Sequence, residues 1–184
     1  LNSITLDSAS TSANSLGLDV DDNSAITSLA VGHTTPVSIA AGKTLSGAVT
    51  VSAGTLKLDK TGTLASNISM SGGTLDADES LTISGTLTQS GNITIDVAEN
   101  KTLGYSGAAV NLGAKTLTMN GKGTFNNTNA LRLSGSSRLL LSNTTTVGSV
   151  STSANNSGVD INEDSTITSL AVGHTTPLSI ADGK

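Results

Sequence analysis

The sequence contains no cysteine and no tryptophan, and it has a single tyrosine and a single phenylalanine in 184 residues. The lack of cysteine excludes disulfide bonds and cysteine-ligated metal centres. Aromatic residues make up only 1% of the chain, so a spherical core would lack the large rings that usually fill its centre. A core built from Leu, Ile, Val and Ala favours a thin, elongated interior.

Charge is also scarce. Charged residues make up 12% of the chain, which is about half the usual share. The 9 basic residues are scattered among 14 acidic ones, so we expect no nucleic-acid-binding surface. No apolar run approaches the roughly 18 residues of a membrane-spanning helix. The chain starts with Leu1 and stops inside a repeated motif, so we expect it to be a piece of a longer protein, with any secretion signal elsewhere.

A long repeat is visible without alignment to any other protein. Residues 10–43 match residues 151–184 at 24 of 34 positions, with an offset of 141 residues. The shared stretch includes "ITSLAVGHTTP", which carries both histidines and both prolines of the chain. The parent protein is therefore expected to repeat a unit of 141 residues.

A shorter period divides this unit. Segments of the form apolar-x-apolar recur every 19 to 22 residues, and seven of these intervals make one 141-residue unit. We number each short unit from its first apolar residue, position +0; positions +2 and +8 are also apolar. The +0 residues are Leu18, Val37, Leu56, Leu75, Ile95, Leu117, Leu139, Val159 and Leu178, and the complete units have Ile26, Leu45, Leu64, Ile83, Leu103, Phe125, Val147 and Ile167 at +8.

A period near 20 residues is typical of solenoid folds, and alternation of apolar and polar residues over three to five positions is typical of strands. Gly, Asn and Asp between these segments indicate turns, and no helical periodicity is present. We therefore predict that residues 1–184 form one all-β domain, a parallel β-solenoid of about nine coils with three short strands per coil. Equivalent residues of successive coils should stack about 4.8 Å apart.

Residues 42–75, "GKTLSGAVTVSAGTLKLDKTGTLASNISMSGGTL", resemble the repeats of secreted bacterial β-helix proteins. Autotransporter passenger domains and filamentous-haemagglutinin-type adhesins have the same period and similar "GGTL" joins between turn and strand. This resemblance implies an extracellular or cell-surface protein, often an adhesive one, and it carries over no catalytic residue. The 141-residue unit further resembles the stalk arrays of long surface adhesins.

The function expected from these features is structural: a stalk or spacer segment of a long, repetitive bacterial surface protein, without enzymatic activity or cofactor. Its expected partners are neighbouring solenoid repeats, with any surface glycan or protein ligand bound elsewhere in the parent protein. Because both end coils would expose unpaired strand edges, we also expect head-to-tail stacking of molecules. The alternatives are a Ca²⁺- or glycan-binding solenoid module and, less favoured, a polysaccharide-active β-helix enzyme.

Three acidic turns, at residues 19–23, 76–80 and 160–164, are considered for Ca²⁺ binding, because carboxylate oxygens are the ligands that Ca²⁺ prefers. The first and third are the same position of the long repeat and hold the candidate ligands. They contain Asp19, Asp21 and Asp22 in the first copy of the long repeat and Asp160, Glu163 and Asp164 in the second. Neither turn has the EF-hand spacing or a Gly-rich nonapeptide. The competing interpretation is that these acids belong to solvated turns that keep the rod soluble.

An enzymatic function would need paired carboxylates, and Asp76 and Asp96 are the candidates. Both occupy position +1, so they should point outward about 5 Å apart on adjacent coils. A glycosidase uses two carboxyl groups at such a spacing. Sugar-binding enzymes usually add aromatic residues, but only Tyr105 and Phe125 are present, and Phe125 occupies a core position.

Other conspicuous residues have simpler explanations. His33 and His174 have no predictable nucleophile or carboxylate partner, so we expect them in surface turns between coils. Thr-x-Thr occurs at residues 86–88, 116–118 and 166–168, but at different positions in the coil, so these pairs should not form one flat ice-binding face. Lys60 and Glu79 share position +4 on adjacent coils, which predicts a surface ion pair.

Overall fold

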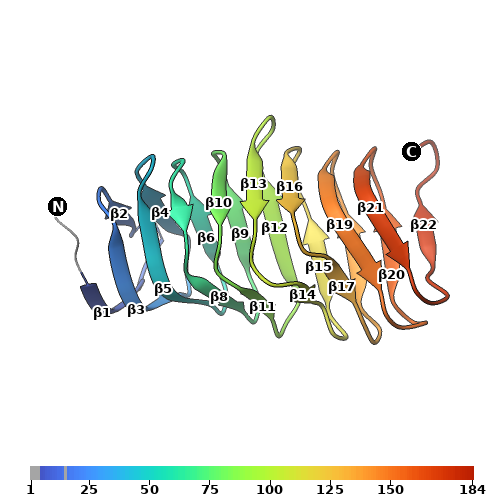
Figure 1. The fold of residues 1–184 in the computed structure, drawn as a ribbon, viewed down its shortest axis with the longest axis horizontal. Coiled ribbons are helices and arrows are strands. Elements are labelled where there is room, and N and C mark those ends of the chain that lie inside the picture. Colours follow the sequence, from blue (N-terminus) through green and yellow to red (C-terminus); the bar gives the residue numbers. More distant parts are fainter. Residues whose placement is uncertain (1–4, 15) are drawn as a thin grey trace.

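The computed structural model describes residues 5–14 and 16–184, which form strands and turns stacked along one axis into a rod (Figure 1). Every strand pairing is parallel, and no helix occurs in the described residues. The predicted all-β parallel solenoid of about nine coils is confirmed. Residues 1–4 and residue 15, which the predicted single domain of residues 1–184 includes, lie outside the described part.

One side of the rod is a nine-stranded sheet that receives one strand from each coil. Its strands begin at the +0 or a nearby residue of each short unit. In spatial order they are β2 (Leu18–Val20), β4 (Thr35–Ile39), β6 (Thr55–Leu58), β9 (Thr74–Ala77), β12 (Ile93–Val97), β15 (Thr116–Met119), β18 (Arg138–Leu141), β20 (Gly158–Ile161) and β22 (Leu178–Ile180).

The rest of the circumference is a thirteen-stranded sheet. Towards the two ends of the rod, the second and third predicted segments run together as one strand: β1 (Thr5–Ser10), β3 (Ser24–Val31), β5 (Thr44–Val51), β19 (Thr146–Thr152) and β21 (Thr166–Val172). In the four middle coils they are separate strands: β7 (Thr63–Leu64) and β8 (Asn67–Met70), β10 (Leu81–Ile83) and β11 (Leu87–Gln89), β13 (Thr102–Tyr105) and β14 (Val110–Asn111), β16 (Thr124–Asn127) and β17 (Leu131–Leu133).

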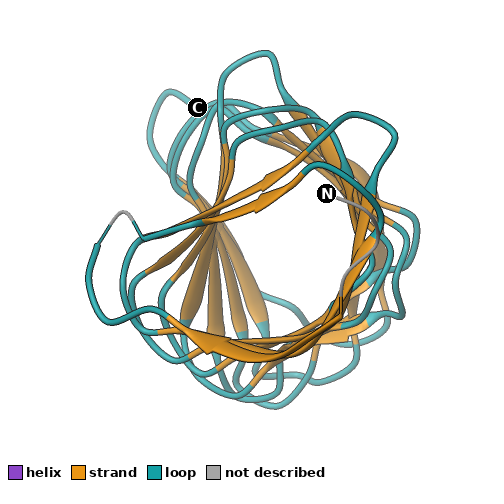
Figure 2. Cartoon of the chain, turned by 90° about the vertical axis from the view of Figure 1, so that its left-hand side faces the viewer, coloured by secondary structure: helices purple, strands orange, loops and turns teal. Residues whose placement is uncertain are grey.

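The long strands turn a corner without breaking. In β5, Leu45 and Val49 are buried. Gly47 and Ala48, which follow each other in the sequence, both face solvent. Two outward side chains in succession interrupt the alternation of a strand and turn its direction around the core. The end-on view shows the result, a closed ring of strands with turns projecting at its corners (Figure 2).

The core consists of the predicted apolar columns. All the +0 residues from Val37 to Val159 are at most 1% exposed. Six of the eight predicted +0 neighbours are paired as expected, from Leu18–Val37 to Val159–Leu178. The stacking of equivalent residues is therefore the basis of the core, as the repeat predicts.

The remaining pairings are displaced by two residues. Val37 pairs with Leu58 rather than Leu56, and Ile95 pairs with Met119 rather than Leu117. The +8 column has two similar displacements, because Ile26 pairs with Gly47 and Ile83 pairs with Tyr105. Side chains alternate with a period of two, so a shift of two residues keeps buried residues opposite each other at three of these steps; at the fourth, buried Ile26 lies opposite Gly47, which faces solvent at the corner of β5. The expected pairs at these four steps were therefore wrong, because the apolar pattern predicts which residues are buried and not which of two registers pairs them.

Tyr105 and Phe125 fill the interior of the wider middle coils. Both rings are buried and stack with their centroids 6.0 Å apart. The Tyr105 hydroxyl accepts a hydrogen bond from the Leu87 amide (3.0 Å) and donates one to the Ala108 carbonyl (2.7 Å), while burial raises the pKa of the phenol. Tyr105 thus satisfies main-chain groups near β11 and β14, which have no ladder between them.

Candidate functional site

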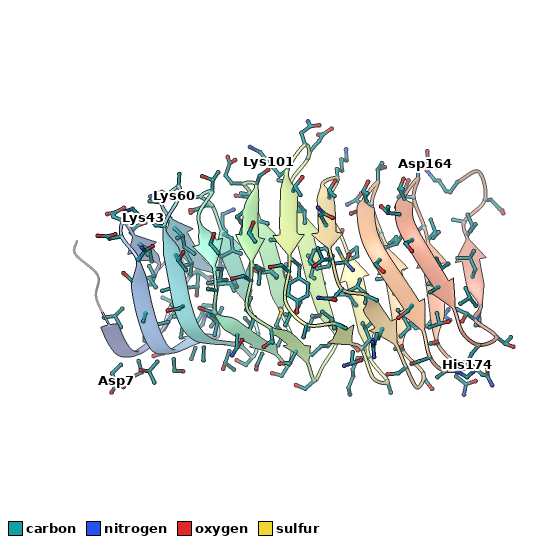
Figure 3. All side chains as sticks on the ribbon, viewed as in Figure 1. Asp7, Lys43, Lys60, Lys101, Asp164 and His174 are labelled. Carbon is teal, nitrogen blue, oxygen red and sulfur yellow. The ribbon has the colours of Figure 1, made fainter. Side chains whose placement is uncertain are left out.

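Most of the sequence-predicted site residues belong to one long edge of the rod, where turns lead out of the nine-stranded sheet. Lys43, Lys60, Lys101 and Asp164 lie along this edge (Figure 3). The edge repeats one contact, in which a lysine at +6 reaches the acid at +4 of the preceding coil. The three instances are Lys43–Asp22 at 3.0 Å, Lys101–Glu79 at 2.5 Å and Lys184–Glu163 at 2.6 Å.

The prediction of an ion pair between Lys60 and Glu79 was wrong. The Glu79 carboxylate accepts a hydrogen bond from Lys101 of the following coil, and the Lys60 ammonium lies 4.0 Å from the Asp19 carboxylate of an earlier coil. Residues at the same position of adjacent coils are neighbours in sequence phase, but these long side chains reach other positions: Glu79 contacts a lysine two positions further along the next coil, and Lys60 reaches an acid two coils away. All of these pairs are exposed enough that each contributes little to stability.

The acids proposed for Ca²⁺ are each placed beside a base or in solvent. Asp22 accepts hydrogen bonds from Lys43 and from the Asn23 amide, and these contacts lower its pKa. Asp160 accepts a hydrogen bond from Arg138 at 2.7 Å, and Asp21 is exposed. In residues 5–14 and 16–184, no three His, Asp or Glu side chains come close enough together to hold a metal ion.

Asp76 and Asp96 are brought together as predicted, because they are directly opposite each other on β9 and β12. Neither is free of partners. The Lys57 ammonium lies 3.7 Å from Asp76 and is also hydrogen-bonded to Asp78, and the Asn120 amide donates to Asp96 at 2.7 Å. The pair belongs to a polar ladder on the outer face of the nine-stranded sheet, of the kind that stabilises cross-strand neighbours.

The Asp76 carboxyl is the electrostatically unfavourable member of this ladder. Burial, followed by the negative charge of Asp78, raises its pKa, although Lys57 opposes the effect. A raised pKa means that the protonated form is favoured in the folded state. Stability from this group is therefore present below the ordinary aspartate pKa of 3.8 and is lost as pH rises through the higher, folded value.

We predict that Asp76→Asn is neutral to slightly stabilising at pH 7, because it removes this cost, and that the difference from the parent chain disappears near pH 3. Thermal unfolding at both pH values measures the effect. Asp78→Asn is the comparison, because it removes a hydrogen-bond partner of Lys57 and should lower stability slightly at pH 7. A substantially lower melting temperature for Asp76→Asn at pH 7 would show that the contact with Lys57 outweighs burial.

Both histidines lie exposed in the turns that were expected for them, His33 before β4 and His174 before β22. The His33 carbonyl accepts hydrogen bonds from the Thr55 amide (3.3 Å) and the Thr35 hydroxyl (3.2 Å), and the His174 carbonyl accepts one from Thr176. His174 lies on the opposite edge of the rod from Lys43 and Asp164 (Figure 3). The Thr55 contact connects two coils through the His33 main chain, whereas the contacts from Thr35 and Thr176 lie within one turn.

The threonines form ladders that the sequence did not predict. Because of the two-residue shift between β12 and β15, Thr118 is next to Thr94, which continues a column from Thr55 and Thr74. The neighbouring outward column of the same sheet contains Lys57, Asp76 and Asp96. A single threonine column beside charged residues is not a flat Thr-x-Thr face, and β-propensity accounts for it.

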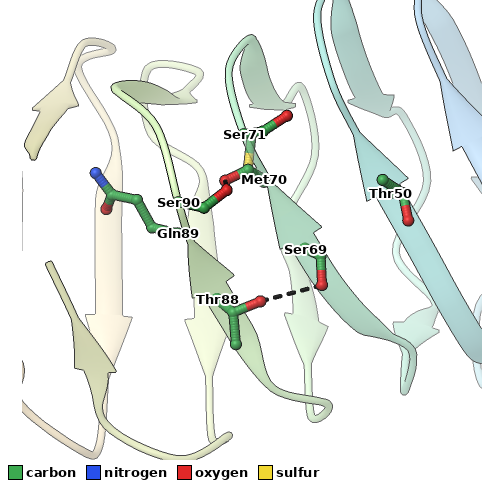
Figure 4. Close-up of a pocket in the computed structure, with 7 residues that line it drawn as sticks. All are labelled: Thr50, Ser69, Met70, Ser71, Thr88, Gln89 and Ser90. Carbon is green, nitrogen blue, oxygen red and sulfur yellow. Dashed lines mark hydrogen bonds between the residues drawn. The ribbon is translucent and has the colours of Figure 1, made fainter. Parts of the chain in front are cut away.

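A shallow hollow of about 260 Å³ on the thirteen-stranded sheet is lined largely by hydroxyl groups (Figure 4). Thr50, Ser69 and Thr88 occupy equivalent positions on β5, β8 and β11, and the Ser69 and Thr88 hydroxyls are hydrogen-bonded at 3.1 Å. Its lining contains no His, Asp, Glu or Lys that could act as the base of a nucleophilic serine or threonine.

The fold and these contacts define the class of protein: a parallel β-solenoid whose polar side chains mostly connect one coil to the next. Comparison of the chain with models of protein families, with curated proteins and with solved structures found no match in any of the three. The described residues also include no helix of the length and apolar character needed to cross a membrane.

Proposed function

We propose that this chain is a segment of a rigid spacer in a long, repetitive protein. The observation that carries the proposal is the position of the long repeat in the fold. Its first copy contains β2, β3 and β4, and its second copy contains β20, β21 and β22, at the same positions of the coil. One unit therefore ends in the phase in which it began, so a following unit can continue the same rod.

Rigidity in such a rod comes from continuity. Main-chain ladders run through both sheets from β1 to β21 and from β2 to β22, and the buried columns run beside them. Each coil packs mainly on its two neighbours, so stability is close to a sum of local terms and length can grow without a new core. Seven coils add about 34 Å per unit at the usual strand spacing.

The location and role of the parent protein follow from the resemblance of residues 42–75 to secreted bacterial β-helix repeats. We place the chain in an extracellular or cell-surface adhesin, where the spacer holds a binding tip away from the cell. Its partners are the neighbouring units of the same repeat. The lysine contacts between coils recur in both copies of the long repeat. They support the proposal that these charged residues join coils and do not serve to bind a ligand.

The test is the length of chains that carry one, two and three 141-residue units, measured by electron microscopy and small-angle scattering. We expect the length to increase by about 34 Å per unit with an unchanged cross-section. A matched control carries a ten-residue flexible insertion between units, which should produce a hinge. Units that behave as separately tumbling bodies without the insertion would contradict the rod.

The spacer role is tested separately on a cell surface. A terminal epitope displayed on rods of increasing unit number should become accessible to progressively larger antibodies or particles. A rod without any tip should not retain cells on immobilised glycans. Glycan binding by the rod alone would instead favour the alternative function, a glycan-binding solenoid module.

A further inference from the structure

The turn between β15 and β16 contains a chemically reactive pair of residues, Asn120 and Gly121. It is the only asparagine–glycine pair in the sequence. When glycine follows asparagine, no side chain hinders the glycine amide nitrogen as it approaches the asparagine side-chain carbonyl. This pair is therefore the position in the chain where an asparagine most readily loses its side-chain amide.

The fold leaves the attacking nitrogen of this pair without a partner. Asn120 and Gly121 are both partly exposed. The Asn120 amide donates a hydrogen bond to the Ile95 carbonyl (2.8 Å), and the Gly123 amide donates one to the Val97 carbonyl (2.9 Å). Between them, the Gly121 amide donates no hydrogen bond to any of the described residues. No hydrogen bond has to break before its nitrogen can react.

The packing of this turn also requires the glycine. Gly121 has φ = 85°, a conformation that residues with a Cβ atom disfavour. A Cβ atom there would overlap main-chain atoms of Val97 and would lie 2.6 Å from the Asp96 carboxylate. The reactive pair is thus a consequence of how closely the turn packs on the preceding coil.

The Asn120 side chain is the middle member of a polar ladder across three coils. Its amide nitrogen donates to the Asp96 carboxylate (2.7 Å), and its amide oxygen accepts from the Asn143 amide (3.2 Å). A carboxylate at position 120 could not donate to Asp96, because it has no hydrogen to donate. It would instead place a second negative charge beside that of Asp96, and like charges on neighbouring strands destabilise their pairing.

We infer that Asn120 is a site of spontaneous deamidation, and that its product weakens the contact between the coils of β12 and β15. The Gly121 nitrogen attacks the side-chain carbonyl carbon of Asn120 and loses its proton to solvent. The hydrogen bond from Asn143 stabilises the charge that develops on the carbonyl oxygen. The bond from this carbon to the amide nitrogen then breaks, and the nitrogen takes up a proton and leaves as ammonia. The product is a cyclic imide.

Water completes the reaction. It adds to one of the two imide carbonyl carbons and opens the ring, which gives aspartate or isoaspartate at position 120. The net change converts an amide and water into a carboxylic acid and ammonia, so no oxidant or cofactor is needed. Isoaspartate also adds a methylene group to the main chain at this turn, between the two hydrogen bonds that join it to the preceding coil. The reaction does not depend on the spacer role proposed above.

Peptide mapping by mass spectrometry tests the site on the folded chain during prolonged incubation at neutral pH. Cleavage after lysine releases residues 116–122, in which Asn120 has the only side-chain amide. Asn143 is the internal control, because it belongs to the same ladder but is followed by Thr144. Asn120 should lose its amide at least about 10-fold faster than Asn143. In water enriched in the heavy oxygen isotope, the product should contain the heavy isotope.

The structural consequence is tested with variants at position 120. Asn120→Asp imitates the product and should speed amide hydrogen exchange in β15 by about 10-fold, because its charge lies beside Asp96. Asn120→Ser is the matched control, since it removes the amide without adding a charge and should have a smaller effect. Asp96→Asn in the Asn120→Asp chain removes one of the two charges and should restore slow exchange. If Asn120→Asp does not fold, the deamidated fraction of the parent chain, separated by ion exchange, replaces it.

Three results would overturn the inference. The first is equal rates of amide loss at Asn120 and Asn143. The second is an Asn120 amide that persists in the folded chain but is lost in urea, because the fold would then protect the pair. The third is the same hydrogen exchange in Asn120→Asp, Asn120→Ser and the parent chain, because the product would then leave the coil contact intact. None of them affects the length increments of joined units, so the proposed rod is tested independently.

Discussion

Gly47→Ala is expected to lower the free energy of unfolding by about 3 kcal/mol, one of the largest effects of any single change in this chain. Gly47 lies at the corner of β5 with φ = 125°, a conformation that residues with a Cβ atom strongly disfavour. A Cβ atom there would also overlap the Ile26 carbonyl oxygen. Since that clash is with main chain, relief requires β3 and β5 to separate.

Gly32→Ala is the matched control, because it lies in the turn after β3 and a Cβ atom there has no neighbour within 4 Å. It should change stability by less than about 0.5 kcal/mol. Urea unfolding gives the total effect, and amide hydrogen exchange should show increased opening in β3 and β5, because the solenoid is stabilised locally. Equal stabilities of the two variants would show that the corner of β5 is not constrained as described.

The same corner illustrates why the sequence predicts the columns better than their pairing. Alternation identifies Ile26 and Leu45 as buried, and both are. Yet Ile26 pairs with Gly47, and the register changes again between Ile26 and Leu29. At other shifted steps, such as Val37 with Leu58, a shift of two residues conserves the buried face, so the apolar pattern there does not distinguish the two registers. The close approach of main chain at Gly47 is visible only in three dimensions.

Ion pairs were less predictable than the core for a related reason. The repeat places Lys60 and Glu79 at one position of adjacent coils, but contacts are made by long side chains that cross two positions, as in Lys101–Glu79. The spacing between Lys43 and Asp22 and between Lys184 and Glu163 is the same in both copies of the long repeat. Comparing lysine-to-acid spacings between the two copies could have revealed this contact from the sequence.

Asn127 is a residue whose importance the sequence does not reveal, because asparagines are frequent in the turns of this chain. Its side chain is only 4% exposed at the end of β16. The amide nitrogen donates to the carbonyls of Asn129 (2.9 Å) and Ser149 (2.7 Å), and the amide oxygen accepts from the amides of Gly148 (3.1 Å) and Ser149 (3.3 Å). One side chain thus satisfies four main-chain groups at the corner of two coils.

We predict that Asn127→Leu lowers the free energy of unfolding by about 4 kcal/mol, because a side chain of similar size leaves these main-chain groups without partners. Asn126→Leu is the matched control on the preceding, exposed residue and should cost less than about 0.5 kcal/mol. Urea unfolding compares the two, and hydrogen exchange should locate the loss at Gly148 and Ser149. If both variants were equally stable, water would be forming the hydrogen bonds to these main-chain groups in place of the Asn127 amide. A selective loss for Asn127→Leu would instead show that a buried polar side chain, as well as the apolar columns, fixes where β19 turns.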